Sequence, residues 1–92
     1  MSAVPMPQEV QALLPLARVW GIPDDVDRSM KLENASGQDL RELVERVAAA
    51  GDVVYEWLET SKDDLSNADY VAVTSLTMAA DEARVILRSL GR

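Results

Sequence analysis

The segment 66–90 limits what this chain can fold into more than any other part of it. It contains neither Pro nor Gly, and its apolar residues recur at steps of three and four, which places them on one side of an α-helix. Polar residues, Thr77 among them, occupy the other side. We therefore predict one long C-terminal helix that offers its apolar side to the core. The residues of that side are Val73, Leu76, Ala80, Ala83, Leu87 and Leu90, widened by Ala72, Ala79 and Ile86.

Three apolar residues of the same segment do not fit this side. Val71, Met78 and Val85 are spaced seven apart and lie between two polar rows. The first interpretation, which we favour, is that another element of the fold covers them as well. The second is that they form an exposed apolar line that a partner could use, and in a homodimer this line would be the dimer seam.

Shorter helical segments precede the long one. From Gln8 to Trp20 the apolar residues keep helical spacing, although Pro15 interrupts them and Gly21 ends the pattern. One kinked helix and two short helices are both consistent with it. We expect Trp20 and Trp57 in the core, each with a hydrogen-bond partner for its indole N–H.

A second short helix is predicted from Asp24 to about residue 34. Aspartates are favoured at a helix N-terminus, where they accept hydrogen bonds from free backbone N–H groups. Asp24 with Arg28, and Asp27 with Lys31, are spaced i, i+4 and are predicted to form ion pairs.

Ser36 is a predicted N-cap for the helix that follows, and Ser66 or Asn67 for the long last helix. At Gly51 a glycine C-cap is followed directly by Asp52, a good N-cap, yet the apolar spacing continues through it. We favour two helices here, with one bent rod as the alternative.

The chain shows no alternating strand pattern, so the predicted class is all-α. We expect a compact four- or five-helix bundle with a long C-terminal central helix. Residues 1–7 would be a flexible N-terminus, and residues 8–92 a single helical domain.

Composition excludes several kinds of chemistry. The chain has no Cys and no His, which removes thiol nucleophiles, disulfides and the commonest transition-metal ligands. Sixteen acids and nine bases give a net charge of −7, which disfavours nucleic acids and anionic membranes and favours a basic protein as partner. We see no secretory signal and no apolar run of membrane-spanning length, so we expect a cytoplasmic protein.

Acidic charge is concentrated in the segment 52–69. Six acids and one base give this segment a charge of −5. One interpretation is an ordinary solvated helix face with N-cap residues. The other is a recognition surface for a basic protein, anchored by an exposed tyrosine. The partner-binding residues would be Tyr55, Glu56, Glu59, Asp63 and Asp64.

The sequence offers little for catalysis or metal binding. A calcium loop starting at Asp25 would place Met30 where Gly is required and Ser36 where the bidentate Glu is required. The four glycines are isolated, and no GxSxG motif occurs. We therefore expect no metal, no cofactor and no enzymatic activity.

Two stretches, LLPLARVWGIPDD at 13–25 and YVAVTSLTMAAD at 70–81, resemble parts of small uncharacterised acidic helical proteins of bacteria. In size, charge and helical content the chain is also similar, in a general way, to the immunity proteins of bacterial toxin systems. That similarity implies an inhibitor that neutralises a basic toxin such as a nuclease. The alternative hypothesis is a self-associating structural or regulatory helical protein.

Overall fold

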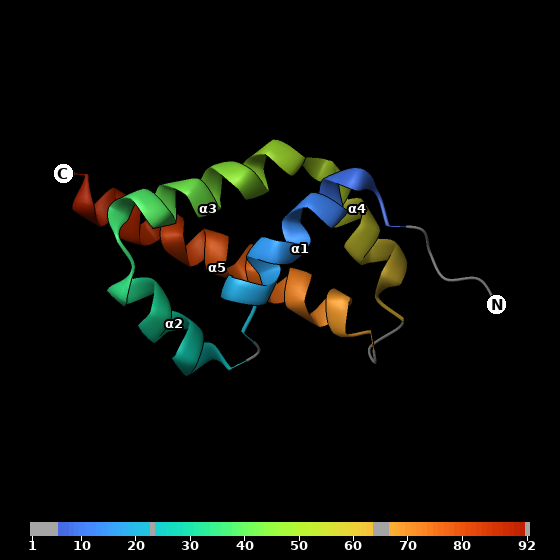
Figure 1. The fold of residues 1–92 in the computed structure, drawn as a ribbon, viewed down its shortest axis with the longest axis horizontal. Coiled ribbons are helices and arrows are strands. Elements are labelled where there is room, and N and C mark those ends of the chain that lie inside the picture. The colour runs from blue at the N-terminus through green and yellow to red at the C-terminus, as the bar shows by residue number, and fades with distance from the viewer. Residues whose placement is uncertain (1–5, 23, 64–66, 92) are drawn as a thin grey trace.

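The computed structural model describes residues 6–22, 24–63 and 67–91. These residues form five α-helices and no strand, which confirms the all-α bundle (Figure 1). The helices are α1 (Gln8–Trp20), α2 (Asp25–Asn34), α3 (Gly37–Ala50), α4 (Asp52–Ser61) and α5 (Ala68–Leu90).

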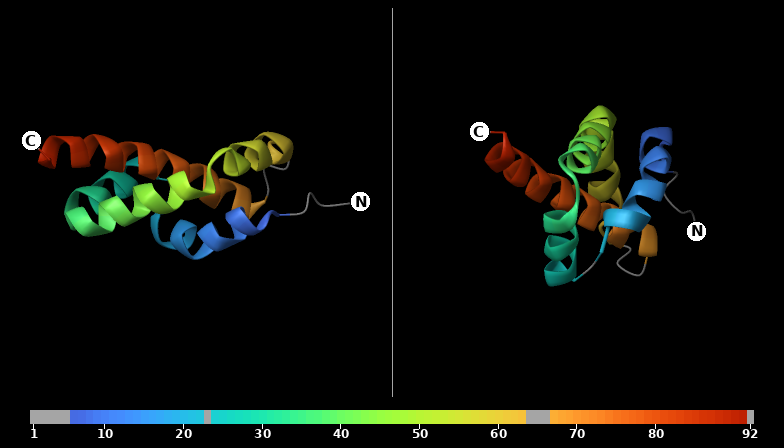
Figure 2. Two further views of the ribbon diagram at one scale, coloured as in Figure 1. Left: turned by 90° about the horizontal axis from the view of Figure 1, so that it is seen from above. Right: turned by 60° about the vertical axis from the view of Figure 1, so that its left-hand side comes forward.

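The long helix α5 is central, as the sequence predicts. It packs against all four other helices, most extensively against α3 and α1. The molecule is elongated, with extents of 49 × 25 × 18 Å. Helix α4 lies at one end of the long axis, and the C-terminal turns of α5 lie at the other (Figures 1 and 2). The two ends of the molecule are therefore built from different parts of the chain.

Side-chain caps fix where three helices begin. Asn67 accepts hydrogen bonds from the backbone N–H groups of Asp69 and Tyr70 at the start of α5, at 2.9 and 3.4 Å. Ser36 caps α3 by accepting from the Asp39 N–H at 3.1 Å, and Asp24 caps α2. Each cap satisfies backbone N–H groups that the helix itself leaves free.

Pro15 and Gly51, where the sequence predicts a bend or a break in a helix, have different effects on the chain. Pro15 lies inside α1, which is a single helix, and Pro7 is the residue that precedes its first turn. At Gly51 the chain does break, with φ of 63° and ψ of −148°, a conformation that only glycine adopts readily. Two helices, α3 and α4, therefore meet at Gly51.

The core follows the predicted apolar side of α5 except at Leu90 and Thr77, and it also takes in Ser75, which is buried. Val73, Leu76, Ala80 and Ala83 are buried, but Leu90 at the end of the helix is 65% exposed. The last turns of α5 extend past the other helices (Figure 2), so the helices of the described residues leave this side chain open to solvent. The placement of Thr77 on the solvent side is also wrong: Thr77 is buried, and its hydroxyl donates to the Thr74 carbonyl at 2.7 Å.

Both tryptophans are buried, as predicted. The Trp57 ring lies 6.4 Å from the Tyr70 ring, and Lys31 places its ammonium group 5.6 Å from the centre of the Trp20 ring. The predicted hydrogen bond of the Trp57 indole is not formed with any described residue.

Candidate protein-binding surface

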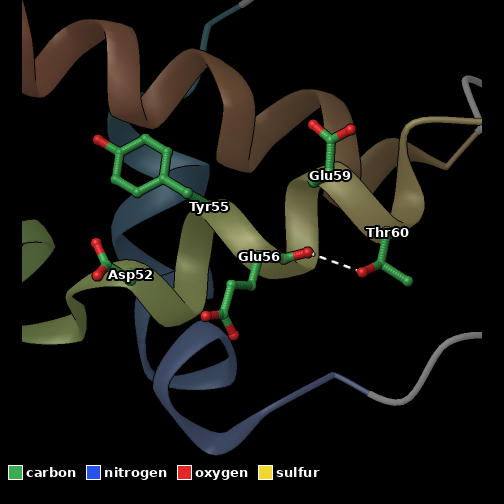
Figure 3. Close-up of a pocket in the computed structure, with 5 residues that line it drawn as sticks. All are labelled: Asp52, Tyr55, Glu56, Glu59 and Thr60. Atoms are coloured by element: carbon green, nitrogen blue, oxygen red, sulfur yellow. Dashed lines mark hydrogen bonds between the residues drawn. The ribbon is translucent and has the colours of Figure 1, made fainter.

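One face of α4 gathers carboxylates around a tyrosine. Its residues recur at steps of three and four along the helix, on the side opposite the buried Val54 and Trp57. They line an open hollow of about 640 Å³ at the surface (Figure 3). We call this the acidic α4 face; it consists of Asp52, Tyr55, Glu56, Glu59 and Thr60.

Tyr55 is half exposed, at 50% of its full surface. The inward positions of α4 are taken by Val54 and Trp57, so helical geometry turns Tyr55 toward solvent. A tyrosine buries a large area on binding and loses little side-chain entropy, which is why exposed tyrosines often anchor protein interfaces.

The charge of this face is only partly neutralised within the chain. Lys62 lies 2.6 Å from a carboxylate oxygen of Glu59, and the hydrogen bond and attraction of that carboxylate raise the pKa of Lys62. Asp52 and Glu56 form no ion pair with any described residue. The segment 52–69 carries −5, whereas the rest of the chain, with ten acids and eight bases, carries −2. The negative charge is thus concentrated at the α4 end of the molecule.

The structure brings together three of the five predicted partner-binding residues. Tyr55, Glu56 and Glu59 share the acidic α4 face. Asp63 is exposed in the turn after α4 and does not line the hollow, and Asp64 lies outside the described residues.

Two members of the face, Asp52 and Thr60, are not among the partner-binding residues predicted from the sequence. Their spacing from Tyr55 and Glu56 is helical, so the same periodicity that identifies the core could have found them. The Thr60 hydroxyl donates to the Glu56 carbonyl at 2.8 Å, which turns it back toward its own helix.

The α5 apolar row, defined as Val71, Met78 and Val85, faces solvent. These side chains are 36%, 49% and 63% exposed. The expectation that another element covers them is therefore wrong. Helix α2 reaches the edge of the row, where Val85 lines a hollow with Ser29 and Glu33, but it does not bury the side chain.

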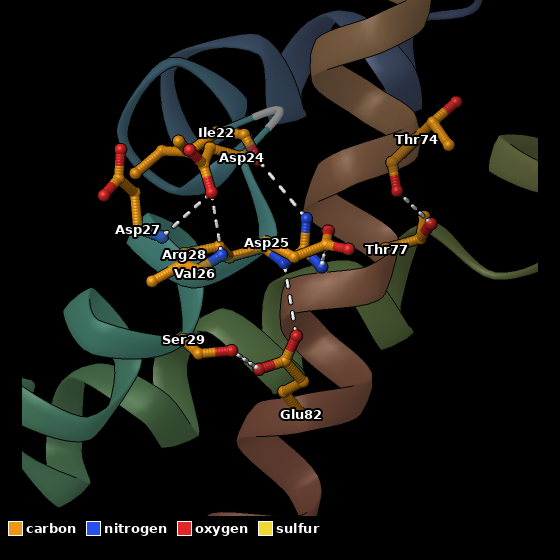
Figure 4. A network of polar contacts seen from close by, with 10 residues as sticks. All are labelled: Ile22, Asp24, Asp25, Val26, Asp27, Arg28, Ser29, Thr74, Thr77 and Glu82. Atoms are coloured by element: carbon orange, nitrogen blue, oxygen red, sulfur yellow. Dashed lines mark hydrogen bonds and ion pairs between the residues drawn. The ribbon is translucent and has the colours of Figure 1, made fainter.

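A polar cluster joins α2 to α5, and the predicted ion pairs of α2 are wrong. Arg28 is buried, and its guanidinium lies 2.7 Å from Asp25 and 3.2 Å from Glu82 (Figure 4). It also donates to the Ile22 carbonyl at 3.3 Å, and the Ser29 hydroxyl donates to Glu82 at 2.8 Å. Since Glu82 is distant in sequence, no local spacing rule could have indicated this contact. The cluster holds α2 against α5. Its guanidinium, hydroxyl and carboxylate groups bind one another, so we do not treat it as a binding site.

Among the described residues, no three acidic side chains come together in a way that could hold a metal ion. No helix in this part of the chain is both long enough and apolar enough to cross a membrane. Comparison with protein families, curated proteins and solved structures finds no match to the chain.

Proposed function

We propose that this chain is an acidic protein-binding module that engages a basic protein through the acidic α4 face. The observation that carries the proposal is the half-exposed Tyr55 among the carboxylates of Asp52, Glu56 and Glu59 on one helix face. The tyrosine supplies contact area, and the carboxylates supply a charge that attracts and orients a basic surface.

The specific role that we propose is that of an immunity or inhibitor protein for a basic toxin such as a nuclease. A nuclease must hold the phosphate groups of its substrate, so its substrate-binding surface is rich in Lys and Arg. A compact acidic protein can compete for that surface by presenting carboxylates where the phosphates would lie. Immunity proteins are also small, acidic and helical, and this general likeness, inferred from the sequence, is why we propose this role rather than another.

Electrostatic attraction of this kind depends on salt. Charges on an exposed face are screened beyond about 10 Å at 0.1 M ionic strength, so association should slow as salt rises. Asp52 and Glu56 are the carboxylates to test first, because Lys62 already partly neutralises Glu59.

The experiment uses the chain as bait in a cell lysate at low salt, followed by elution with a salt gradient. Four baits are compared: the wild type, Glu56→Lys, Tyr55→Ala and Glu45→Lys. Glu45→Lys is the matched control, since it makes the same charge change at an exposed position of α3. A basic protein should be retained by the wild type and by Glu45→Lys, and lost from the other two baits.

The captured protein is then assayed for nuclease activity with increasing amounts of the chain. Inhibition that is complete at a one-to-one ratio, and weakened by Glu56→Lys, supports the inhibitor role. Equal retention by all four baits, or retention that salt does not affect, would contradict binding through the acidic α4 face.

A further inference from the structure

The α5 apolar row is a continuous feature rather than scattered surface residues. Its three members are one heptad apart, so they lie along one line that runs about 21 Å down the helix. Single exposed apolar residues are common on protein surfaces, but residues seven apart stay on one line of a helix and correspond to one of the two apolar positions of a heptad seam. The row therefore offers a narrow apolar line along which a second helix can pack.

The row is also self-complementary. It reads Val, Met, Val, the same in both directions along the helix. A two-fold axis through Met78 would place Met78 against Met78 of a second copy, and Val71 against Val85. A surface that matches itself in this way is what a symmetric homodimer requires. We propose that α5 pairs in antiparallel orientation with α5 of a second copy through the α5 apolar row.

The polar residues beside the row distinguish the antiparallel from the parallel orientation. With the axis at Met78, Asp81 is level with position 75 of the second copy, where the serine is buried in its own chain, so no second carboxylate lies opposite it. Glu82 takes no part, because Arg28 and Ser29 already hold its carboxylate. In a parallel pair Asp81 would be level with Asp81, and equal charges at that distance destabilise the contact.

The ends of the molecule favour the same orientation. The segment 52–69, with its charge of −5, leads into the first turn of α5, whereas Arg88 lies in the last turn. Arg84 lies one turn earlier and is paired with Asp81 of its own helix at 3.3 Å. Antiparallel pairing brings the acidic end of one copy toward Arg88 of the other. Parallel pairing would bring the two acidic ends together. The dimer should consequently weaken as salt rises.

A contact made by one helix face from each copy is small. Stable interfaces bury about 800 Å² per partner, and a single helix face is at the low end of that range. We therefore expect a reversible dimer that is seen at high protein concentration. The α5 apolar row and the acidic α4 face lie on different helices, so Met78→Glu removes the dimer contact without changing the residues of the proposed toxin-binding face.

Analytical ultracentrifugation across about two decades of concentration in the micromolar range tests the state of association. The mean mass of the wild type should rise toward twice that of the monomer. Met78→Glu should remain monomeric at every concentration with unchanged helical content. Val19→Glu is the matched control, because Val19 is equally exposed, at 46%, on a different helix, and it should dimerise like the wild type.

Cross-linking tests the register, and the absence of native cysteine makes it selective. With a short bis-maleimide, Met78→Cys should cross-link to itself. Val71→Cys alone should not, but an equal mixture of Val71→Cys and Val85→Cys should. A wild-type mass that stays monomeric throughout overturns the proposal, and so does cross-linking of Val71→Cys alone at the level of the mixture, which would indicate parallel pairing.

Discussion

Replacing Gly21 by alanine tests how closely α1 approaches α5. A Cβ at Gly21 would lie 2.3 Å from the carbonyl oxygen of Ala72 and 2.5 Å from that of Ala17. Real Cβ atoms essentially never come within 3.0 Å of such neighbours. Both oxygens belong to helix backbones, so they cannot rotate away as the end of a side chain could. The two helices must move apart, or the end of α1 must unwind.

The loss of stability in Gly21→Ala depends on whether side chains or backbone must move to make room for the new Cβ. Adding a methylene to a packed core costs about 1–3 kcal/mol when side chains can adjust. Here the backbone itself is the obstacle, so we expect the free energy of unfolding to fall by at least about 3 kcal/mol. A domain of this length is stable by roughly 5–14 kcal/mol in total. Since about 1 kcal/mol lowers Tm by 4–8 °C at this size, Tm should fall by at least roughly 12 °C.

Urea denaturation and thermal melts, both followed by circular dichroism, measure the loss of stability in Gly21→Ala. The same substitution at two other glycines provides the comparison. Gly37→Ala is the control, because no atom lies within 4 Å of its Cβ position, and we expect a change of at most about 0.5 kcal/mol. Gly51→Ala also has open space but must adopt a positive φ, which costs about 1–3 kcal/mol. The expected order of loss is Gly21, Gly51, Gly37. If Gly21→Ala is no more destabilising than Gly37→Ala, the close approach of α1 to α5 is refuted.

Three further outcomes are expected. Arg28→Ala should lower the free energy of unfolding by about 2–3 kcal/mol in urea denaturation, because it leaves Glu82 without its cation, and Arg28→Met should cost less because it keeps the apolar stem. Both variants remove the charge, so equal losses would mean that the stem contributes nothing, and no loss in either would mean that the ion pair contributes nothing. At a protein concentration low enough for the wild type to be monomeric, Met78→Glu should change that free energy by no more than about 0.5 kcal/mol, since the side chain is half exposed. A large drop in Tm under these conditions would mean that the row is buried after all. The pKa of Lys62 is raised above 10.5, so its bond to Glu59 is intact at neutral pH and is lost only as the pH rises through that higher value. Lys62→Met removes the cation that partly neutralises Glu59, so it should speed association with a basic partner in stopped-flow measurements. Unchanged rates would show that Glu59 takes no part.

The helices could be predicted because their causes are local. Apolar spacing and capping side chains act within a few residues, so Asn67 and Ser36 mark the starts of α5 and α3 from sequence alone. Gly51 was ambiguous because the apolar spacing continues through it, and only its backbone conformation separates α3 from α4. Most of the acidic α4 face was predictable for the same reason, since Tyr55, Glu56 and Glu59 belong to one helix.

What could not be predicted depends on contacts between distant segments. Arg28 pairs with the distant Glu82, as well as with Asp25, rather than with Asp24, and the neighbour of Gly21 is the backbone of Ala72. Helical periodicity gives the direction of each side chain around its own axis, but it does not tell which directions the other helices fill.

The α5 apolar row shows the consequence of this limit most clearly. The core side of α5 and the apolar row are both apolar, and periodicity gives no reason to treat them differently. Four helices pack on α5, and together they bury one side of it while Met78 stays half exposed. The row is therefore exposed because of how the helices are arranged around α5. Within the described residues, no helix of the same copy buries it. An apolar row that reads the same in both directions is a surface that a second copy can cover.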